Sequence, residues 1–339
     1  MLKDTFNRTI DYMRISVTDR CNLRCIYCMP PGGLKPAGHS DILRYEEIVR
    51  ILRVAVHKGV RKVRITGGEP LVRKNITGLI QMIKGIDGLQ QLSLTTNGIL
   101  LEQYAEELAD AGLDRVNISL DSLKPARYRE ITRGGDLEAV LSGIKAAERA
   151  GLTPIKINMI PIRGLNEDEI GEFAKITLTA PYQVRFIEFM PFVPEAMWNR
   201  EKFMSSKEIQ SLVAQIGTLI PAETKKAGPA RYFSFEGAAG VVGFISPISN
   251  HFCTECNRLR LTADGKLRPC LFSETEIDLK PSLRCDEPDA EIRRLIELSI
   301  AVKPKGHEMN IEDIVPLQDC SPMNMIRNRR RRPMSKIGG

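Results

Sequence analysis

Three cysteines, Cys21, Cys25 and Cys28, lie close together near the start of the sequence, with the spacing Cys-x3-Cys-x2-Cys. Cysteines clustered so tightly in a chain without secretory features indicate a metal site. A structural zinc site needs four ligands, and the nearest further candidate in the sequence is His39. Three thiolates on a 4Fe-4S cluster instead leave one iron open to a small molecule. The group therefore favours an iron-sulfur cluster with an open iron over an incomplete zinc site.

A second group, Cys253, Cys256 and Cys270, has the spacing Cys-x2-Cys-x13-Cys. Zinc ribbons use similar spacing, and His251 or Cys285 is available as a fourth ligand. Because only three cysteines fall in this group as well, a second cluster with an open iron is the other interpretation. Such a cluster would face the first across the mouth of the domain and hold the substrate.

The elements that must position these groups follow from a repeated pattern of apolar, β-branched segments and amphipathic segments. Glycine ends several of the amphipathic segments, as at a helix C-terminus, and Asn166 is a plausible helix N-cap. The pattern predicts strands at residues 12–17, 61–66, 91–96, 115–120, 155–160 and 184–189. It predicts helices at residues 44–59, 100–112, 137–151 and 166–176.

Strands that alternate with helices form a parallel sheet, which either stays open or curls into a barrel. The first cysteine group directly follows the first predicted strand, at the end where barrel enzymes carry their chemistry. Beyond Gly228 the sequence becomes glycine-rich with short alternating strands, followed by a charged helical segment at 286–303. We therefore expect an α/β domain at residues 1–228, with the choice between an open sheet and a barrel left open by this pattern, and a smaller α+β domain at residues 229–339 that carries the second cysteine group.

Composition narrows the class of protein. The chain has 339 residues, a formal charge of +7 and no apolar run near the ~18 residues that a membrane helix needs. The positive charge favours anionic partners such as phosphates. Eight cysteines, six of them in two groups, indicate metal binding in a reducing compartment rather than disulfides. A cytoplasmic location is the expectation.

The first cysteine group, with Tyr27 before its last cysteine, resembles the signature of the radical S-adenosylmethionine (SAM) superfamily. The segment ITGGEP at residues 65–70 resembles the loop of that superfamily that binds the amino group of SAM, where Glu69 is able to accept from an ammonium group. The resemblance implies a partial (β/α)6 barrel, a strongly reducing cluster and a 5′-deoxyadenosyl radical made from SAM.

Basic side chains are expected at the same opening. Arg258 and Arg260 lie on one side of an extended segment, and Lys62 and Arg64 project from one face of a predicted strand. Cations that point into a barrel are costly unless an anion meets them, and a triphosphate is the obvious anion.

Both cysteine groups, the Arg-x-Arg segment and the terminal Ile-Gly-Gly together resemble the GTP 3′,8-cyclases of molybdenum cofactor biosynthesis. In that family the deoxyadenosyl radical removes the ribose 3′ hydrogen of GTP, and the carbon radical attacks C8 of guanine to give (8S)-3′,8-cyclo-7,8-dihydro-GTP. The resemblance implies SAM contacts from Tyr27, Gly68, Ser119 and Met190. It implies GTP contacts from Arg14, Lys62, Arg64, Thr95, Lys156, Arg258, Leu259 and Arg260. The roles that it implies for catalysis fall on Arg14, Arg258, Arg260, Gly338 and Gly339.

The same resemblance implies two 4Fe-4S clusters, a reducing electron donor and a cyclic pyranopterin monophosphate synthase downstream. No membrane or nucleic-acid partner is expected, and the sequence leaves the oligomeric state open, a homodimer included. The arginine run at residues 327–332 either meets the triphosphate or solvates the tail, and Cys320 matches no motif.

Two other functions remain open on sequence alone. One is a radical SAM peptide maturase, since such enzymes also carry auxiliary clusters. The other is a zinc ribbon on an α/β scaffold whose basic tail binds RNA. Iron and zinc contents separate the second alternative from the enzymes.

Overall fold

The computed structural model describes residues 1–192, 198–222, 228–285 and 288–307 of the chain. The predictions for Gly338, Gly339, Cys320 and the arginine run at 327–332 lie outside the described residues. Within this part of the chain, no helix is long and apolar enough to cross a membrane.

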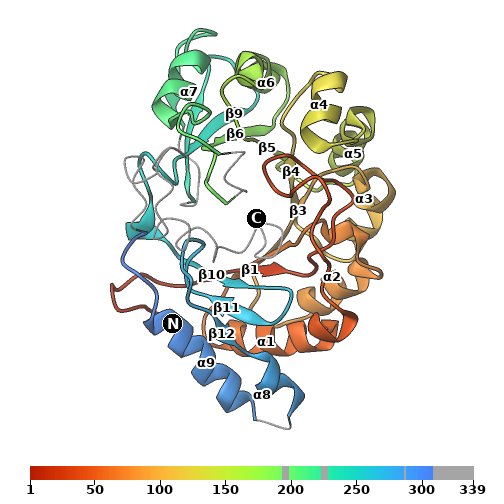
Figure 1. Cartoon of the computed structure of the whole chain (residues 1–339), viewed down its shortest axis with the longest axis vertical. Coiled ribbons are helices and arrows are strands. Elements are labelled where there is room, and N and C mark those ends of the chain that lie inside the picture. Colours follow the sequence, from red (N-terminus) through yellow and green to blue (C-terminus); the bar gives the residue numbers. More distant parts are fainter. Residues whose placement is uncertain (193–197, 223–227, 286–287, 308–339) are drawn as a thin grey trace.

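Six parallel strands, paired in sequence order, curve around a centre with helices on the outside (Figure 1). Each strand covers a segment that the apolar pattern predicted, and the expected partial (β/α)6 barrel is confirmed. The strands are β1 (Tyr12–Ser16), β2 (Lys62–Thr66), β3 (Gln91–Thr96), β4 (Arg115–Ser119), β5 (Lys156–Met159) and β6 (Gln183–Ile187).

The helices between these strands, and α7 after the last of them, cover the outer face of the sheet. The main ones are α1 (Tyr45–His57), α2 (Ile76–Lys84), α3 (Leu101–Asp110), α4 (Pro125–Thr132), α5 (Leu137–Arg149), α6 (Ile170–Thr179) and α7 (Ser206–Val213). Short 3-10 turns lie at η1 (His39–Asp41), η2 (Pro70–Val72), η3 (Glu167–Glu169) and η4 (Cys253–Glu255).

Alternation along the strands separates the core from the barrel interior. In β2, Val63 and Ile65 are fully buried in the main hydrophobic core, whereas Lys62 and Arg64 on the opposite face are only partly buried. Apolar and basic side chains thus project from opposite faces of the strand, because successive residues of a strand point to alternate sides. The apolar face holds the helices, and the polar face lines the interior.

Asn166 occupies the predicted N-cap position, before the turn η3 that leads directly into α6, but its side chain makes no capping hydrogen bond. Asn166 is fully buried, and its amide nitrogen donates to the carbonyl oxygens of Asp121 (2.8 Å) and Ile160 (3.1 Å). Its amide oxygen accepts from the backbone nitrogen of Ile162 at 2.7 Å. The side chain therefore ties the ends of β4 and β5 together, and α6 begins only after the turn η3.

Strands from the C-terminal part of the chain extend both edges of the same sheet. β9 (Val241–Ile245) pairs in parallel with β6, and β10 (Arg258–Leu261) pairs in parallel with β1. Beyond them lie β8 (Ala230–Ser234), β7 (Ile220–Pro221), β11 (Lys266–Arg268) and β12 (Ile277–Asp278), followed by α8 (Lys280–Arg284) and α9 (Asp289–Ala301). The division of the chain at residue 228 stays a prediction.

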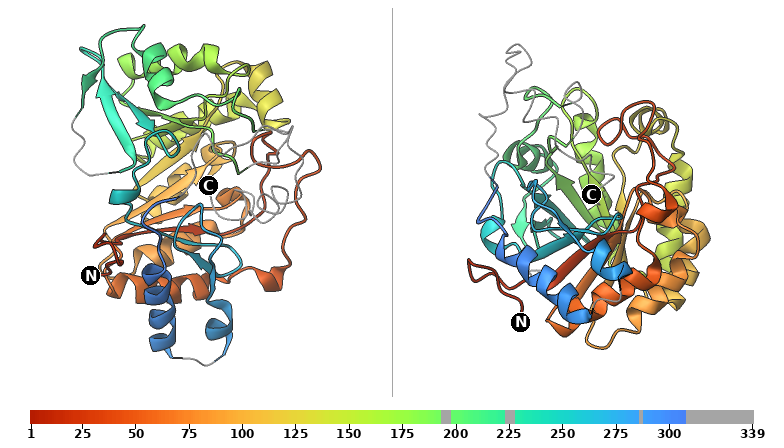
Figure 2. Two further views of the ribbon diagram at one scale, coloured as in Figure 1. Left: turned by 60° about the vertical axis from the view of Figure 1, so that its left-hand side comes forward. Right: turned by 60° about the horizontal axis from the view of Figure 1, so that its bottom comes forward.

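α9 lies beside α1 on the outside of the barrel, as Figure 2 shows. Two ion pairs join these helices: Arg50 with Asp289 at 2.9 Å and Lys58 with Glu297 at 2.7 Å. Exposed pairs of this kind are worth less than ~1 kcal/mol each, so they orient the helices more than they stabilise them. α9 leads the chain back toward the start of β10.

Candidate functional site: a cationic barrel between two cysteine trios

The first cysteine trio, Cys21, Cys25 and Cys28, lies just beyond the carboxyl end of β1. Here the backbone nitrogen of Cys28 donates to the carbonyl oxygen of Cys25 at 2.9 Å, which closes a tight turn. Burial raises the pKa of the Cys25 thiol well above its ordinary value, and the charges of Cys28, Asp121 and Cys21 raise it further. Three thiols close enough to repel one another as thiolates fit a bound cationic iron cluster, which would relieve that repulsion.

A side chain that sequence reasoning missed supports this trio. The amide of Asn97, directly after β3, donates to the Cys21 sulfur at 3.8 Å, and the backbone nitrogen of Leu23 does so at 3.4 Å. Hydrogen bonds to ligand sulfurs are one way in which a protein sets the reduction potential of an iron-sulfur cluster.

The Gly-Gly-Glu segment after β2 packs closely against the loop that leads to the trio. A Cβ on Gly68 would lie 2.2 Å from the carbonyl oxygen of Arg20, so no larger residue fits there without moving the loop. Glu69 is buried, and its carboxylate accepts from Leu71 N (3.0 Å), Thr96 Oγ1 (2.8 Å) and Asn97 N (2.7 Å). Burial raises the pKa of Glu69 to about 7, although these three hydrogen bonds act to lower it.

The residues that the resemblance assigned to SAM lie at this same carboxyl end. Ser119 ends β4, Gly68 follows β2, and Met190 follows β6. Tyr27 and Met190 both pack against a small apolar cluster of Ile162, Phe189, Trp198, Phe203 and Ile248. The Tyr27 hydroxyl donates to Asp121 at 2.5 Å, and burial raises the pKa of Asp121 to about 6. An apolar wall beside polar strand ends suits an adenosine group.

Cations from neighbouring strands lie side by side in the barrel. Arg14 on β1 is in register with Arg260 on β10 and with Arg64 on β2. Burial and the nearby charges of Arg260 and Arg64 hold the pKa of Arg14 well below its ordinary value. Burial, with Arg185 as the next largest cause, lowers the pKa of Lys156 to about 6. Like charges this close destabilise one another, and an anion between them would offset that cost.

Buried polar atoms also lie on the strands of the barrel. Among the described residues, the hydroxyls of Tyr12 and Thr95, the Asn158 side-chain oxygen and the Arg185 Nε are buried without a hydrogen-bond partner. Arg185, on β6, donates to Asn117 at 2.7 Å, and burial lowers its pKa to about 10. Buried polar groups left unsatisfied by the protein indicate a ligand. Of these residues only Thr95 was predicted, although alternation in β6 already places Arg185 opposite the apolar Val184 and Phe186.

The second trio, Cys253, Cys256 and Cys270, lies at the opposite end of the barrel, so the prediction that both trios share one mouth is wrong. Cys256 comes just before β10, which runs parallel to β1, and the first trio comes just after β1. Cys270 follows β11, which runs antiparallel to β10 and therefore returns to the same end. The two trios thus face each other along the cationic interior.

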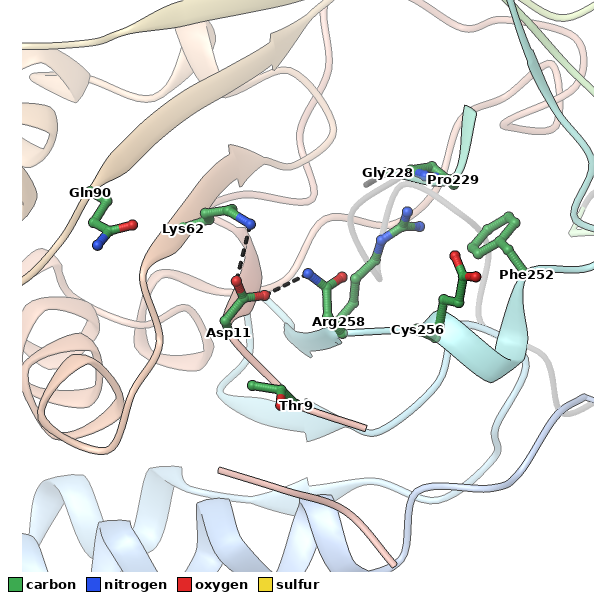
Figure 3. A pocket seen from close by; sticks show the side chains of 11 residues that line it. Thr9, Asp11, Lys62, Gln90, Gly228, Pro229, Phe252, Cys256 and Arg258 are labelled. Atoms are coloured by element: carbon green, nitrogen blue, oxygen red, sulfur yellow. Dashed lines mark hydrogen bonds and ion pairs between the residues drawn. The ribbon is translucent and has the colours of Figure 1, made fainter. Parts of the chain in front are cut away.

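The charged groups around the second cysteine trio differ from those around the first. Burial raises the pKa of Cys253, and the charges of Cys270 and Cys256 add to this effect. Burial would also raise the pKa of Cys256, but the positive charges of Lys303 and Arg258 lower it overall. The Arg258 guanidinium lies over the Phe252 ring at 5.0 Å from its centroid (Figure 3). These mutually close thiols again fit the cationic core of an iron-sulfur cluster, and the cations beside them would stabilise the thiolate ligands.

A cavity of about 490 Å³ opens at this amino end of the barrel, bordered by Cys256, Arg258 and Lys62 (Figure 3). Lys62 donates to Asp11 at 3.0 Å, and Asp11 also accepts from Asn257 at 2.5 Å. Lys62 is therefore already paired with a carboxylate in this structure. The side chain of Leu259, another predicted GTP contact, is buried in the main core, so only its main chain is able to bind a ligand.

The remaining predicted ligands lie apart from one another. Cys285 is exposed at the end of α8, where the neighbouring Arg284 bonds to Glu47 and to the carbonyl oxygen of Ser40. The His251 ring instead contacts the His307 ring, with centroids 4.9 Å apart.

This barrel, with a cysteine trio at the carboxyl end of its first strand, is that of a radical SAM enzyme. Residues 15–176 match the Radical SAM superfamily, and residues 182–309 match the Molybdenum Cofactor Synthesis C family. SuiB of Streptococcus suis, solved with S-adenosylmethionine bound, superposes with a TM-score of 0.60 at 17% identity over 84% of this chain and 68% of its own. That likeness shows the fold alone.

Full-length relatives identify the branch of the superfamily. The chain is 50% identical to the GTP 3′,8-cyclase of Thermodesulfovibrio yellowstonii over 100% of both chains. It is 53% identical to the GTP 3′,8-cyclase of Alkaliphilus metalliredigens over 90% of this chain and 94% of the relative. The chain belongs to the GTP 3′,8-cyclase family. The predicted enzyme class, the role in molybdenum cofactor biosynthesis, and the use of SAM with two 4Fe-4S clusters are thereby confirmed.

Proposed function

We propose that GTP binds inside the barrel between the two cysteine trios and is cyclised there to (8S)-3′,8-cyclo-7,8-dihydro-GTP. The observation that carries this placement is the row of Arg260, Arg14 and Arg64, adjacent in register, in which the charges of Arg260 and Arg64 lower the pKa of the buried Arg14. A triphosphate would offset these positive charges. A charge-assisted hydrogen bond contributes ~1.5 to 3 kcal/mol, so three or four account for most of a micromolar affinity of about 8 kcal/mol.

The two cysteine trios would have different roles, one at each end of the barrel. Cys21, Cys25 and Cys28 would hold the cluster that, with SAM, supplies the 5′-deoxyadenosyl radical. Tyr27, Gly68, Ser119 and Met190 would seat SAM beside it, at the carboxyl end where the structure has them. Cys253, Cys256 and Cys270 would hold the second cluster, which would supply a binding point for the guanine of GTP. The ribose then lies in the middle of the barrel, between the two ends.

The polar interior would orient the substrate between these ends. The GTP contacts are assigned to the side chains of Arg14, Lys62, Arg64, Thr95, Lys156, Arg258 and Arg260, together with the main chain of Leu259. We add Arg185 and Tyr12, because the Arg185 Nε and the Tyr12 hydroxyl have no hydrogen-bond partner among the described residues. Gly338 and Gly339 complete the proposed catalytic set from the C-terminal tail.

The test is an anaerobic incubation of the reconstituted protein with SAM, dithionite and each nucleoside triphosphate in turn, scored for 5′-deoxyadenosine. GTP deuterated at the 3′ position should transfer deuterium to 5′-deoxyadenosine, and ATP should not. Transfer from another position of GTP, or equal turnover with ATP, contradicts the proposal.

Two arginine variants test the placement of the substrate. Arg258→Ala and Arg260→Ala should retain both clusters, because neither side chain is a metal ligand, and should lose cyclisation. Iron content and electron paramagnetic resonance (EPR) spectra of both variants provide the control for intact clusters. Unchanged turnover in either variant refutes its assignment.

In the cell we place the enzyme in the cytoplasm, with a reducing electron donor for the first cluster. Its product would pass to a cyclic pyranopterin monophosphate synthase. Fractionation of the source cells, with the enzyme assayed in each fraction, tests the location.

A further inference from the structure

Lys303, just after α9, is a buried lysine next to the second cysteine trio. Only 3% of its surface is exposed. Its ammonium donates to the carbonyl oxygen of Arg258 at 2.8 Å and to that of Pro269 at 2.6 Å. Arg258 is the first residue of β10, and Pro269 lies between β11 and Cys270. One side chain therefore joins the two strands next to the trio.

The third proton of this ammonium has a sulfur partner. An ammonium group has three donors and no acceptor, and two of the donors are used by the carbonyl groups. The remaining interaction is a hydrogen bond with the Cys256 side chain, where the Lys303 charge also acts. The three protons of the Lys303 ammonium thus bond to residues that belong to the trio or lie next to it.

The charge of Lys303 needs an anion. Within the described part of the chain, no carboxylate forms an ion pair with it, although a buried ammonium is costly unless it is paired. The thiolates of Cys253, Cys256 and Cys270 are the negative groups next to it. An iron-sulfur cluster bound by three thiolates becomes more negative by one charge when it is reduced, so a fixed buried cation favours the reduced state.

The segment that follows Lys303 is fixed against the same trio by Arg8. The Arg8 guanidinium donates to the carbonyl oxygens of Cys253 (2.7 Å), Lys305 (2.8 Å) and Pro304 (2.6 Å) and pairs with Asp4 at 2.5 Å. These bonds leave Lys303 little freedom to move away. The ammonium is thus held in place from both sides.

We propose that Lys303 is a positioning residue of the second cluster, which fixes Cys256 and the Arg258 backbone in one arrangement and favours the reduced form of the cluster through its charge. This inference rests on the proposed placement of that cluster at Cys253, Cys256 and Cys270. It adds a residue that touches neither substrate nor iron.

The experiment isolates the second cluster. The parent protein carries Cys21→Ala, Cys25→Ala and Cys28→Ala, so that only the second trio binds iron. Lys303→Met removes the charge at similar length, Lys303→Arg keeps it, and Lys305→Met is the matched control, because the Lys305 side chain is exposed. Anaerobic redox titration with mediators, followed by EPR, gives the ratio of reduced to oxidised cluster at each potential.

At a potential where the parent is half reduced, Lys303→Met should lower this ratio at least tenfold, which is 59 mV for one electron. The ratio in Lys303→Arg should stay within threefold of the parent, and that in Lys305→Met should be unchanged. An unchanged ratio in Lys303→Met overturns the proposal.

Loss of iron from Lys303→Met is also decisive. If Lys303→Arg keeps its iron and the far-ultraviolet circular dichroism of Lys303→Met is that of the parent, the loss supports the proposal. If Lys303→Arg loses its iron too, or the Lys303→Met chain unfolds, Lys303 serves packing and the proposal is overturned. A parent without iron instead removes the proposed cluster site itself, before any lysine variant is compared.

Discussion

Lys156 gives the sharpest test of the claim that the barrel interior is built for an anion. Burial, followed by the charges of Arg185, Arg115 and Arg64, lowers its pKa from 10.5 to about 6. Between these two values the unfolded chain binds one proton more than the folded protein. The free energy of unfolding should therefore rise with pH across this window, by about 1.4 kcal/mol per pH unit.

From about pH 6.5 to about pH 8.5 this difference amounts to about 2.5 kcal/mol. Lys156→Met removes the titrating group, so its free energy of unfolding should lack this rise. Urea unfolding of the anaerobic, cluster-loaded proteins at both pH values measures the effect, since both proteins contain the same clusters. Lys175→Met is the control, because Lys175 is 51% exposed on α6. An equal pH dependence in wild type and Lys156→Met would refute the reasoning.

The same pKa predicts proton uptake when GTP binds. The triphosphate should restore the charge of Lys156, so binding near pH 8 should take up about one proton in the wild type and none in Lys156→Met. Calorimetry in two buffers of different ionisation enthalpy measures this number. Binding without proton uptake in the wild type would place the triphosphate elsewhere.

Three further variants test separate parts of the structure. Gly68→Ala should lower SAM affinity and iron content, because its Cβ would lie 2.2 Å from the Arg20 carbonyl oxygen, whereas Gly32→Ala meets nothing within 4 Å and should bind SAM as the wild type does. Arg185→Met should weaken GTP binding about tenfold, the loss of one charge-assisted hydrogen bond, in equilibrium dialysis. Arg8→Met should lower the free energy of unfolding by about 3 to 5 kcal/mol, because its aspartate partner stays buried without a counter-charge, and urea unfolding measures the loss.

Local patterns predicted much of the fold. The six strands of the barrel and the helices α1, α3 and α5 occur where apolar periodicity and glycine stops placed them. Period-two alternation also separated the interior cations Lys62 and Arg64 from the buried Val63 and Ile65. These features depend on neighbours in the sequence, which a pattern is able to record.

Long-range pairing accounts for what the sequence did not reveal. The second trio reaches the amino end of the barrel because β10 pairs with β1, and no local pattern specifies that partner. Arg8 and Lys303 act through backbone carbonyl groups, and Arg8 lies 245 positions from Cys253. Carbonyl groups occur in every residue, so such contacts leave no signature in side-chain spacing.

The most direct test of the account is the iron content of three proteins reconstituted anaerobically. The wild type should hold about eight irons per chain and no zinc. Replacing either Cys21, Cys25 and Cys28 or Cys253, Cys256 and Cys270 by alanine should leave about four, with a single EPR signal. Zinc at the second trio, or eight irons after either replacement, would contradict two clusters at opposite ends of one cationic barrel.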